Sequence, residues 1–170
     1  MKKIFCLILA LMLAMSMAAC GDTDPTVPTG GNEPTPANDG YIFNYKGTAI
    51  VMHADAAPIL AALGEPKTYT EETSCAFEGK DKTYFFGSFY LQTYPIGDKD
   101  YVYGVWFADD SVSTDEGVYV GMSQSEVEAA YGTDSFNGSN AYIMTKGASR
   151  LTVILTDGVV SSIQYDALVD

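Results

Sequence analysis

The 170-residue sequence has little cysteine, little histidine and little positive charge. It contains three cysteines, one histidine, and nine lysines and arginines against 22 acidic residues, a net charge of −13. Three cysteines are too few for a disulfide framework, and one histidine cannot build a His-rich metal site. The negative charge repels nucleic acid and anionic lipid headgroups. We therefore expect no nucleic-acid partner, no metal and no cofactor.

The first nineteen residues have the pattern of a secretory signal. Lys2 and Lys3 precede the apolar run FCLILALMLAMSM, which ends in small residues. Residues 17–21, MAACG, resemble a bacterial lipobox, which implies cleavage before Cys20 and a diacylglyceryl group on its sulfur. Met17 replaces the usual leucine, so ordinary cleavage nearby is the alternative. A lipid on Cys20 would anchor the protein to the outer face of a bacterial membrane without spanning it, and the chain after the signal would carry a net charge of −15.

Cys75 is then the one cysteine available to the mature protein, because Cys6 leaves with the signal and Cys20 carries lipid. Its apolar surroundings, Cys75-Ala76-Phe77, favour a small buried residue. A catalytic thiol would need His53 as its base, but the ordinary interpretation of His53 is a surface residue at a strand end. We expect no catalytic residues.

The chain after Cys20 divides into a tether and one domain. Residues 21–40, GDTDPTVPTGGNEPTPANDG, bury too little apolar surface to fold, which predicts a disordered tether. Residues 41–170 are long enough and apolar enough for a single core. We expect one domain in two related halves, about 41–114 and 115–170.

The two halves share a pattern at residues 49–65 and 117–133. Each copy predicts a short strand (Thr48–Met52, then Gly117–Gly121) followed by a two-turn helix. Asp55 is suited to cap the first helix. In the second copy, Ser123 and Glu126 have the spacing of a capping box. Each helix has one apolar stripe and ends at a glycine, Gly64 or Gly132, so both need packing on a sheet to be stable.

Each helix is followed by expected strands. We predict them at Ser74–Glu78, Lys82–Tyr94, Tyr101–Ala108, Ala141–Lys146, Arg150–Thr156 and Val159–Tyr165. Asp157-Gly158 predicts a tight hairpin between the last two. The pattern indicates an α+β fold, with two repeats of a short helix on an antiparallel meander and with the helices on one face of the sheet.

Two stretches carry a resemblance to a known family. Ser113 to Ser123, with Val127 and Tyr131-Gly132, resembles a motif of small bacterial envelope proteins that have the fold of the β-lactamase inhibitor protein. That fold is shared with small lipoproteins of outer-membrane assembly. Leu151 to Val160 resembles the closing hairpin of the family. The resemblance covers about residues 48–166. It implies one curved sheet that grips protein partners on its open face, and it transfers no catalytic or binding residue.

The candidate binding surface is aromatic. Period-two alternation along Tyr84–Tyr94 places Phe85, Phe89 and Leu91 on a face under the helices and the tyrosines on the other. Tyrosine is enriched at interfaces, although aromatic residues also simply favour strands. The predicted partner-binding residues are Tyr84, Phe86, Tyr90, Tyr94, Tyr101, Tyr103 and Trp106.

One acidic segment could be considered as a calcium-binding site. Residues 109–116, DDSVSTDE, gather four acids, but they lack the ligand spacing of an EF-hand loop. A solvated turn is the expected structure, and the same holds for Asp98 and Asp100.

The sequence predicts a membrane-anchored, non-enzymatic lipoprotein that binds another envelope or extracellular protein through the aromatic face. An alternative is a structural accessory subunit that braces an envelope assembly complex. A hydrolytic or metal-dependent enzyme is a third hypothesis, which would need a buried cluster around His53, Cys75 or the acidic turn.

Overall fold

A computed structural model describes residues 39–169 of the chain. The predicted signal peptide, Cys20 and nearly all of the predicted tether lie outside the described residues. The described residues all belong to one compact unit. Among the described residues, no helix is both long enough and apolar enough to cross a membrane.

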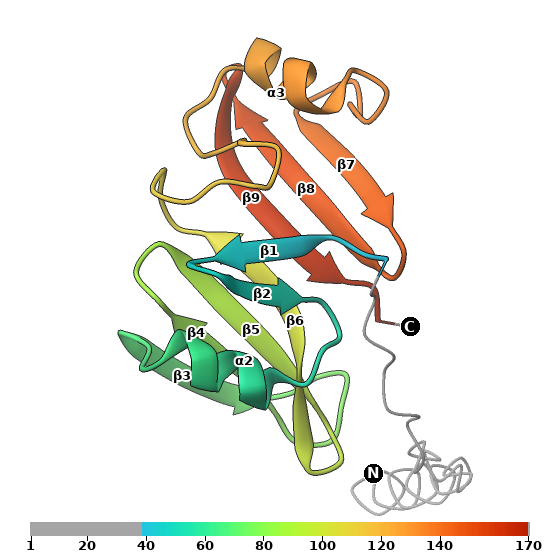
Figure 1. Ribbon diagram of the computed structural model, residues 1–170. Helices are drawn as coiled ribbons and strands as arrows, with labels where there is room; N and C mark the ends of the chain where they lie inside the picture. The colour runs from blue at the N-terminus through green and yellow to red at the C-terminus, as the bar shows by residue number, and fades with distance from the viewer. Residues whose placement is uncertain (1–38, 170) are drawn as a thin grey trace, which may run out of the picture. The chain divides into compact units, whose positions relative to one another are not determined.

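The fold is α+β, with two short helices, a seven-stranded antiparallel sheet and a separate hairpin (Figure 1). The strand order in the sheet is β3-β4-β5-β6-β9-β8-β7, and every pairing is antiparallel. Its strands are β3 (Thr68–Thr73), β4 (Lys80–Phe85), β5 (Phe89–Ile96), β6 (Lys99–Phe107), β7 (Ala141–Lys146), β8 (Ser149–Thr156) and β9 (Val159–Ala167). The hairpin consists of β1 (Ile42–Tyr45) and β2 (Thr48–Val51).

Two meanders, β3–β6 and β7–β9, make up the sheet. They join where β6 pairs with β9, through the residue pairs Gly104–Asp166, Val105–Tyr165 and Trp106–Gln164. Three pairs make this the shortest pairing between neighbouring strands of the sheet. The continuity of the sheet therefore depends on a short junction at its centre.

One face of the sheet carries the core. Directly opposed residues point to the same face, and one row of them crosses five strands and is buried throughout: Leu91, Val105, Tyr165, Leu151 and Met144. Ala56 and Ile59 of α2 (Ala56–Leu63) and Val127 of α3 (Gln124–Tyr131) belong to the same hydrophobic cluster. Both helices thus contribute to the core on this face, which we call the core face.

The predicted helix caps are confirmed. The Asp55 carboxylate accepts a hydrogen bond from the Ala57 N–H at 3.0 Å. Ser123 and Glu126 form a capping box, in which the Glu126 carboxylate accepts from the Ser123 N–H at 2.8 Å and from its hydroxyl at 2.7 Å. These bonds lower the pKa of Glu126. Gly64 and Gly132 end the helices with φ of 80° and 75°.

Three strand predictions are wrong. Residues 74–79 form a loop, and the edge strand lies earlier, at Thr68–Thr73. Residues 82–94 form two strands, because the chain reverses at Phe86–Ser88, where Gly87 has φ of 98°. Residues 117–121 are not a strand. The Thr114 N–H instead bonds the Val118 carbonyl at 2.9 Å, and the Gly121 N–H bonds Val160 at 2.8 Å.

The β1–β2 hairpin crosses the junction of the two meanders (Figure 1). Phe43 of β1 is 1% exposed, and its ring centroid lies 5.1 Å from that of Phe89, 5.0 Å from Phe107 and 5.9 Å from Tyr165. These three rings belong to β5, β6 and β9. One side chain of the hairpin therefore packs on both meanders.

Candidate functional site

The second face of the sheet, the open face, is the candidate site. A row of directly opposed residues crosses all seven strands on this face: Thr68, Phe85, Tyr90, Trp106, Gln164, Thr152 and Ile143. None of them is buried, and Tyr90 and Ile143 are 38% and 46% exposed. On β5 to β9, each residue of this row is next in the chain to a residue of the buried row on the core face, so exposure alternates along these strands.

Aromatic rings concentrate at the β4–β6 end of the open face. The Phe85 and Tyr90 rings stack with centroids 4.5 Å apart and an interplanar angle of 24°. Trp106 lies directly opposite Tyr90 on the next strand. Beside the stack is a pocket of about 130 Å³, which is lined by Thr68, Thr70, Thr83, Phe85 and Tyr90. This end combines exposed ring surface with hydroxyl groups.

The middle of the open face is polar. Arg150 donates to the Asp166 carboxylate across β8 and β9 at 3.2 Å. Asp166 is 5% exposed, whereas the Arg150 side chain is 42% exposed. A guanidinium has five donors, and Asp166 is the one partner of Arg150 among the described residues. Arg150 therefore presents a positive charge to anything that covers this face.

The predicted division of the aromatic residues between two faces is wrong. It assumed one strand from Lys82 to Tyr94, but the reversal at Phe86–Ser88 places Tyr84 opposite Leu91 and Phe85 opposite Tyr90. Tyr84 and Phe86 pack against the core instead of lying on the open face. Phe85, which was predicted to lie under the helices, belongs to the open face. The Gly87-Ser88 pair is the sequence signal for this turn.

Tyr94 and Tyr101 are buried, each 3% exposed, so neither side chain is available to a partner. A register shift between Gln92 and Thr93 changes the pairing on the way to Tyr94. The Phe77 ring lies 4.9 Å from the Tyr94 ring. Burial raises the pKa of Tyr94 to about 12. Tyr103 is half-buried against the core cluster. Of the predicted binding residues, Tyr90 and Trp106 remain on the open face.

His53 is buried, which corrects its expected place on the surface. It has φ of 64°, and Nδ1 lies 2.8 Å from the Tyr94 hydroxyl. Nε2 lies 3.0 Å from the Ala148 carbonyl. Because a carbonyl only accepts, Nε2 donates this bond. His53 therefore links β5 to the β7–β8 turn.

Cys75 is exposed, although the sequence predicted a buried residue. It lies in the 74–79 loop, where the Ser74 hydroxyl accepts from the Phe77 N–H at 3.2 Å. This turn holds the backbone of the loop without covering the thiol.

Three of the four acids in the 109–116 segment bind groups of the domain itself. Asp109 accepts from the N–H and the hydroxyl of Ser111, which lowers the pKa of Asp109. Asp115 accepts from Asn44 at 3.0 Å, and Glu116 accepts from the Tyr131 hydroxyl at 2.7 Å. Across residues 39–169, no three histidine, cysteine or acidic side chains gather closely enough to hold a metal ion.

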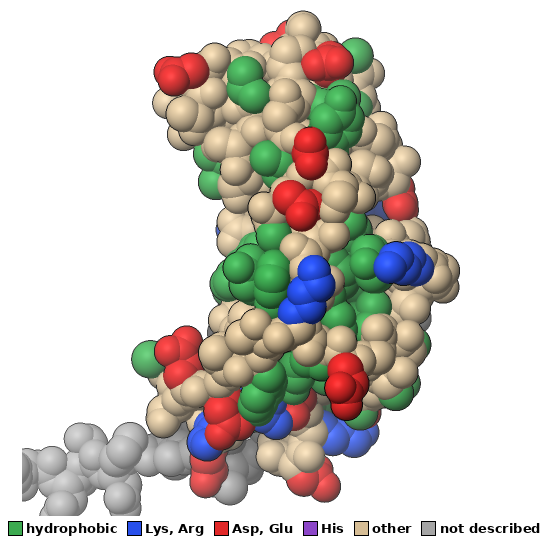
Figure 2. Space-filling model, turned by 90° about the vertical axis from the view of Figure 1, so that its left-hand side faces the viewer, with side chains coloured by type: hydrophobic (Ala, Val, Ile, Leu, Met, Phe, Trp, Pro, Cys, Tyr) green, Lys and Arg blue, Asp and Glu red, His purple; other side chains and the backbone are tan. Residues whose placement is uncertain are grey.

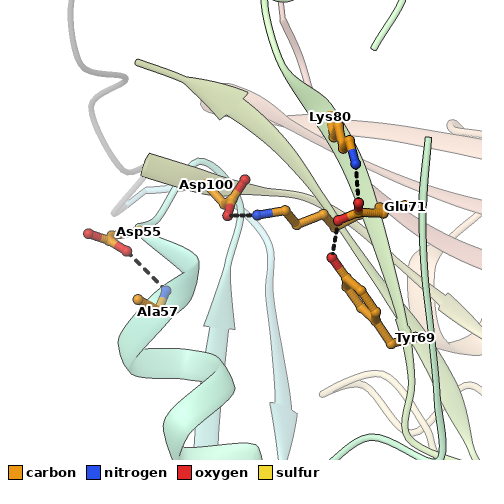
Figure 3. A network of polar contacts seen from close by, with 7 residues as sticks. Asp55, Ala57, Tyr69, Glu71, Lys80 and Asp100 are labelled. Atoms are coloured by element: carbon orange, nitrogen blue, oxygen red, sulfur yellow. Dashed lines mark hydrogen bonds and ion pairs between the residues drawn. The ribbon is translucent and has the colours of Figure 1, made fainter. Parts of the chain in front are cut away.

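A second polar network lies on β3, β4 and β6 (Figure 3). The Glu71 carboxylate accepts from the Tyr69 hydroxyl at 2.6 Å and also pairs with Lys80. Hydrogen bonds from Lys80 and Tyr69 lower the pKa of Glu71, and the bond to Glu71 raises the pKa of Tyr69 to about 12. Lys82 donates to Asp100 at 2.6 Å, which raises the pKa of Lys82. The Glu71–Lys80 pair therefore joins the edge strand β3 to β4, and the Lys82–Asp100 pair joins β4 to β6.

Hydrophobic side chains also reach the surface where the hairpin turn meets the sheet. Figure 2 shows them gathered at mid-height, with acidic side chains mainly above and below. The Tyr45 ring meets the Phe89 ring edge-on with centroids 4.8 Å apart, and the Phe86 ring stacks on Phe89 at 5.3 Å. The Lys46 ammonium lies over the Tyr45 ring at 5.0 Å. This surface is the edge of the core, partly covered by a lysine.

Comparisons with known proteins give no family. No family model matches the chain, and no curated protein matches it. The chain has a distant similarity to a solved structure, an extracellular protein containing an SCP domain from Bacillus anthracis str. Ames, with 13% identity and a TM-score of 0.40. The match covers 67% of this chain and 43% of that chain, so this chain spans less than half of that protein. A similarity at this level carries no argument about function.

Proposed function

We propose that the protein is a membrane-anchored lipoprotein that binds another protein of the cell envelope or its surroundings through the open face of its sheet. The lipid on Cys20 supplies the anchor, and residues 21–40 supply the tether. The observation that carries the proposal is the open-face row, in which seven strands present side chains that neither helix covers. The resemblance of residues 48–166 to envelope proteins that bind partners on such a face favours the same function.

The composition of the open face supports binding. Tyrosine, tryptophan and arginine are the residues most enriched in the energetically important centres of interfaces. Tyr90 and Trp106 lie on neighbouring strands, and Arg150 offers unpaired donors further along the face. Ile143 extends the apolar surface to β7. A partner with an apolar centre and a carboxylate would complement this arrangement.

Photo-crosslinking in the source cells tests the proposal. The full chain would carry p-benzoylphenylalanine in place of Tyr90, or in place of Tyr119 as a matched control. The two tyrosines are 38% and 40% exposed, but Tyr119 lies in the loop before α3. We expect a defined protein adduct from position 90 and none from position 119. An adduct from position 119 alone would place the interface elsewhere.

A second pair of variants tests whether the whole face takes part. Ile143→Ser should weaken the adduct at position 90, because it removes an apolar side chain at the other end of the same row. Val159→Ser is the control, because Val159 is similarly exposed, at 43%, but lies at the hairpin turn beside the cap of α3. Equal loss with both variants would indicate general destabilisation and not a contact with the partner.

A further inference from the structure

The pocket beside the Phe85–Tyr90 stack has unusual chemistry for a surface hollow. Its lining consists of three threonines and two aromatic rings, without a charged side chain. The hydroxyls of Thr68, Thr70, Thr83 and Tyr90 have no hydrogen-bond partner among the described residues. Four groups that can each donate and accept therefore surround one small space.

We propose that this pocket binds a neutral pyranose ring of a saccharide. The inference goes beyond the proposed protein interface, because it assigns a small-molecule site that does not depend on the identity of any protein partner. Three features carry it: the stacked rings, the free hydroxyls and the absence of charge in the lining.

The aromatic stack supplies a surface for the apolar side of the ring. The face of an aromatic ring is negative, so it attracts the slightly positive C–H groups that line one side of a pyranose. Tyr90 is 38% exposed, and its ring is held by stacking on the Phe85 ring at 4.5 Å. A surface fixed in this way loses little entropy when a ligand stacks on it.

The threonine hydroxyls match the rim of a sugar. Thr70 and Thr83 are directly opposed on β3 and β4, and Thr68 lies on the same face two residues from Thr70. A pyranose carries hydroxyls around its edge that both donate and accept, as threonine hydroxyls do. An aromatic side chain in the pocket would instead dehydrate these hydroxyls without replacing their hydrogen bonds, which is unfavourable.

The size of the pocket and the charge beside it limit the class of ligand further. The hollow of about 130 Å³ is open to solvent, so it can receive one sugar ring while the rest of a saccharide lies outside it. The next pair along the same face, Glu72 and Asp81, is acidic and disfavours an anion. The ligand is therefore a neutral sugar and not an acidic one.

The test uses the single tryptophan of the chain as a reporter, because Trp106 lies opposite Tyr90. The full chain would be purified in lauryldimethylamine N-oxide and titrated with cellotriose, maltotriose, chitotriose or galactotriose. Alkyl maltosides must be avoided, because their headgroup is itself a neutral sugar. We expect at least one of the four saccharides to change Trp106 fluorescence saturably in the millimolar range.

Matched threonine variants identify the site. Thr83→Val and Thr70→Val keep the β-branched shape and remove the hydroxyl, and each should weaken binding about three- to ten-fold. Thr145→Val makes the same change on β7, on the same face but away from the pocket, and should leave binding unchanged. Far-UV circular dichroism and the thermal midpoint identify any variant that fails to fold.

Two outcomes would overturn the proposal. One is the absence of saturation by all four saccharides up to ~50 mM, well above millimolar affinity; the other is equal binding by wild type and the folded Thr70→Val and Thr83→Val variants. N-acetyl-tyrosinamide is titrated in parallel, and its saturation without that of any saccharide would reassign the pocket to a side chain of a protein partner. That result would leave the crosslink at position 90 intact, so the two proposals fail separately.

Discussion

At Gly104 the sheet junction has room for a hydrogen atom but not for a methyl group. A Cβ on this residue would lie 2.6 Å from the Tyr165 carbonyl oxygen and 3.5 Å from an Asp166 carboxylate oxygen. The closer contact is with backbone, which cannot rotate away. We expect Gly104→Ala to lower the free energy of unfolding by about 1–3 kcal/mol, measured by urea denaturation.

Ser162→Ala is the control for this prediction. Ser162 lies on β9, on the same face of the sheet as Asp166, and its replacement by alanine makes the side chain smaller instead of larger. Its effect should stay within about 0.5 kcal/mol. If the two variants were equally stable, the close approach at Gly104 would not constrain the junction.

The buried hydroxyl of Tyr94 predicts a loss of stability at alkaline pH. Burial raises its pKa from 10.0 to about 12, so the folded chain retains a proton that the unfolded chain releases near pH 10. Stability is then fully present below pH 10 and falls as the pH rises from 10 to 12. Urea midpoints measured across this window should decline.

Tyr94→Phe should make that decline shallower, because phenylalanine has no proton to lose. The decline should not vanish, because burial also raises the pKa of Tyr131 and Tyr165. An unchanged slope in Tyr94→Phe would show that Tyr94 does not contribute to the alkaline transition.

The helices depend on their caps, because each is only eight residues long. Isolated helices of this length are unstable in water. Asp55→Ala removes the acceptor of the Ala57 N–H and should lower the free energy of unfolding by about 1 kcal/mol. Chemical denaturation followed by circular dichroism measures this change.

Asp55→Asn separates the cap from the charge. Asparagine also accepts at a helix N-cap, whereas it loses the ion pair with Lys99 at 3.8 Å. An exposed pair of this kind contributes little, so Asp55→Asn should stay close to wild type. If it were as unstable as Asp55→Ala, the charge and not the cap would be what stabilises α2.

The strand predictions are correct where residues typical of a turn mark the ends of the strands. Asp157 and Gly158 have φ of 52° and 77°, as a tight hairpin turn requires, and β7 has the predicted bounds. The prediction failed at residues 86–88, where aromatic residues on both sides concealed the turn. It also failed at residues 117–121, because a strand needs a neighbouring strand and the second half of the chain has no counterpart of β1.

At the scale of the whole domain, the β1–β2 hairpin packs across the junction of the two meanders. Phe43 touches rings from β5, β6 and β9, while the two meanders share three residue pairs. We expect Phe43→Ala to cost about 3–5 kcal/mol and to speed hydrogen exchange at the β6–β9 amides. Phe136→Ala is the comparison, because Phe136 is half-buried beside β7, 5.0 Å from the Tyr142 ring.

Exchange that rises equally in β3–β4 and in β6–β9 would contradict this role for Phe43. It would mean that the domain opens as one unit and that the hairpin does not specifically protect the junction. Rapid exchange confined to β6 and β9 is the expected pattern.

The sequence by itself determined the α+β class, both helices with their caps, and the strands of the second meander. Each depends on neighbours within a few residues: Ser123 and Glu126 are three apart, and Asp157-Gly158 is a single turn. Tertiary structure alone decided which aromatic residues face outward, because the Phe86–Ser88 reversal and the register shift at Gln92 reassign the faces. The burial of His53 likewise depends on Ala148, 95 residues away. Local hydrogen bonds leave a pattern in sequence, whereas the side of a sheet that a residue faces depends on partners brought near by folding.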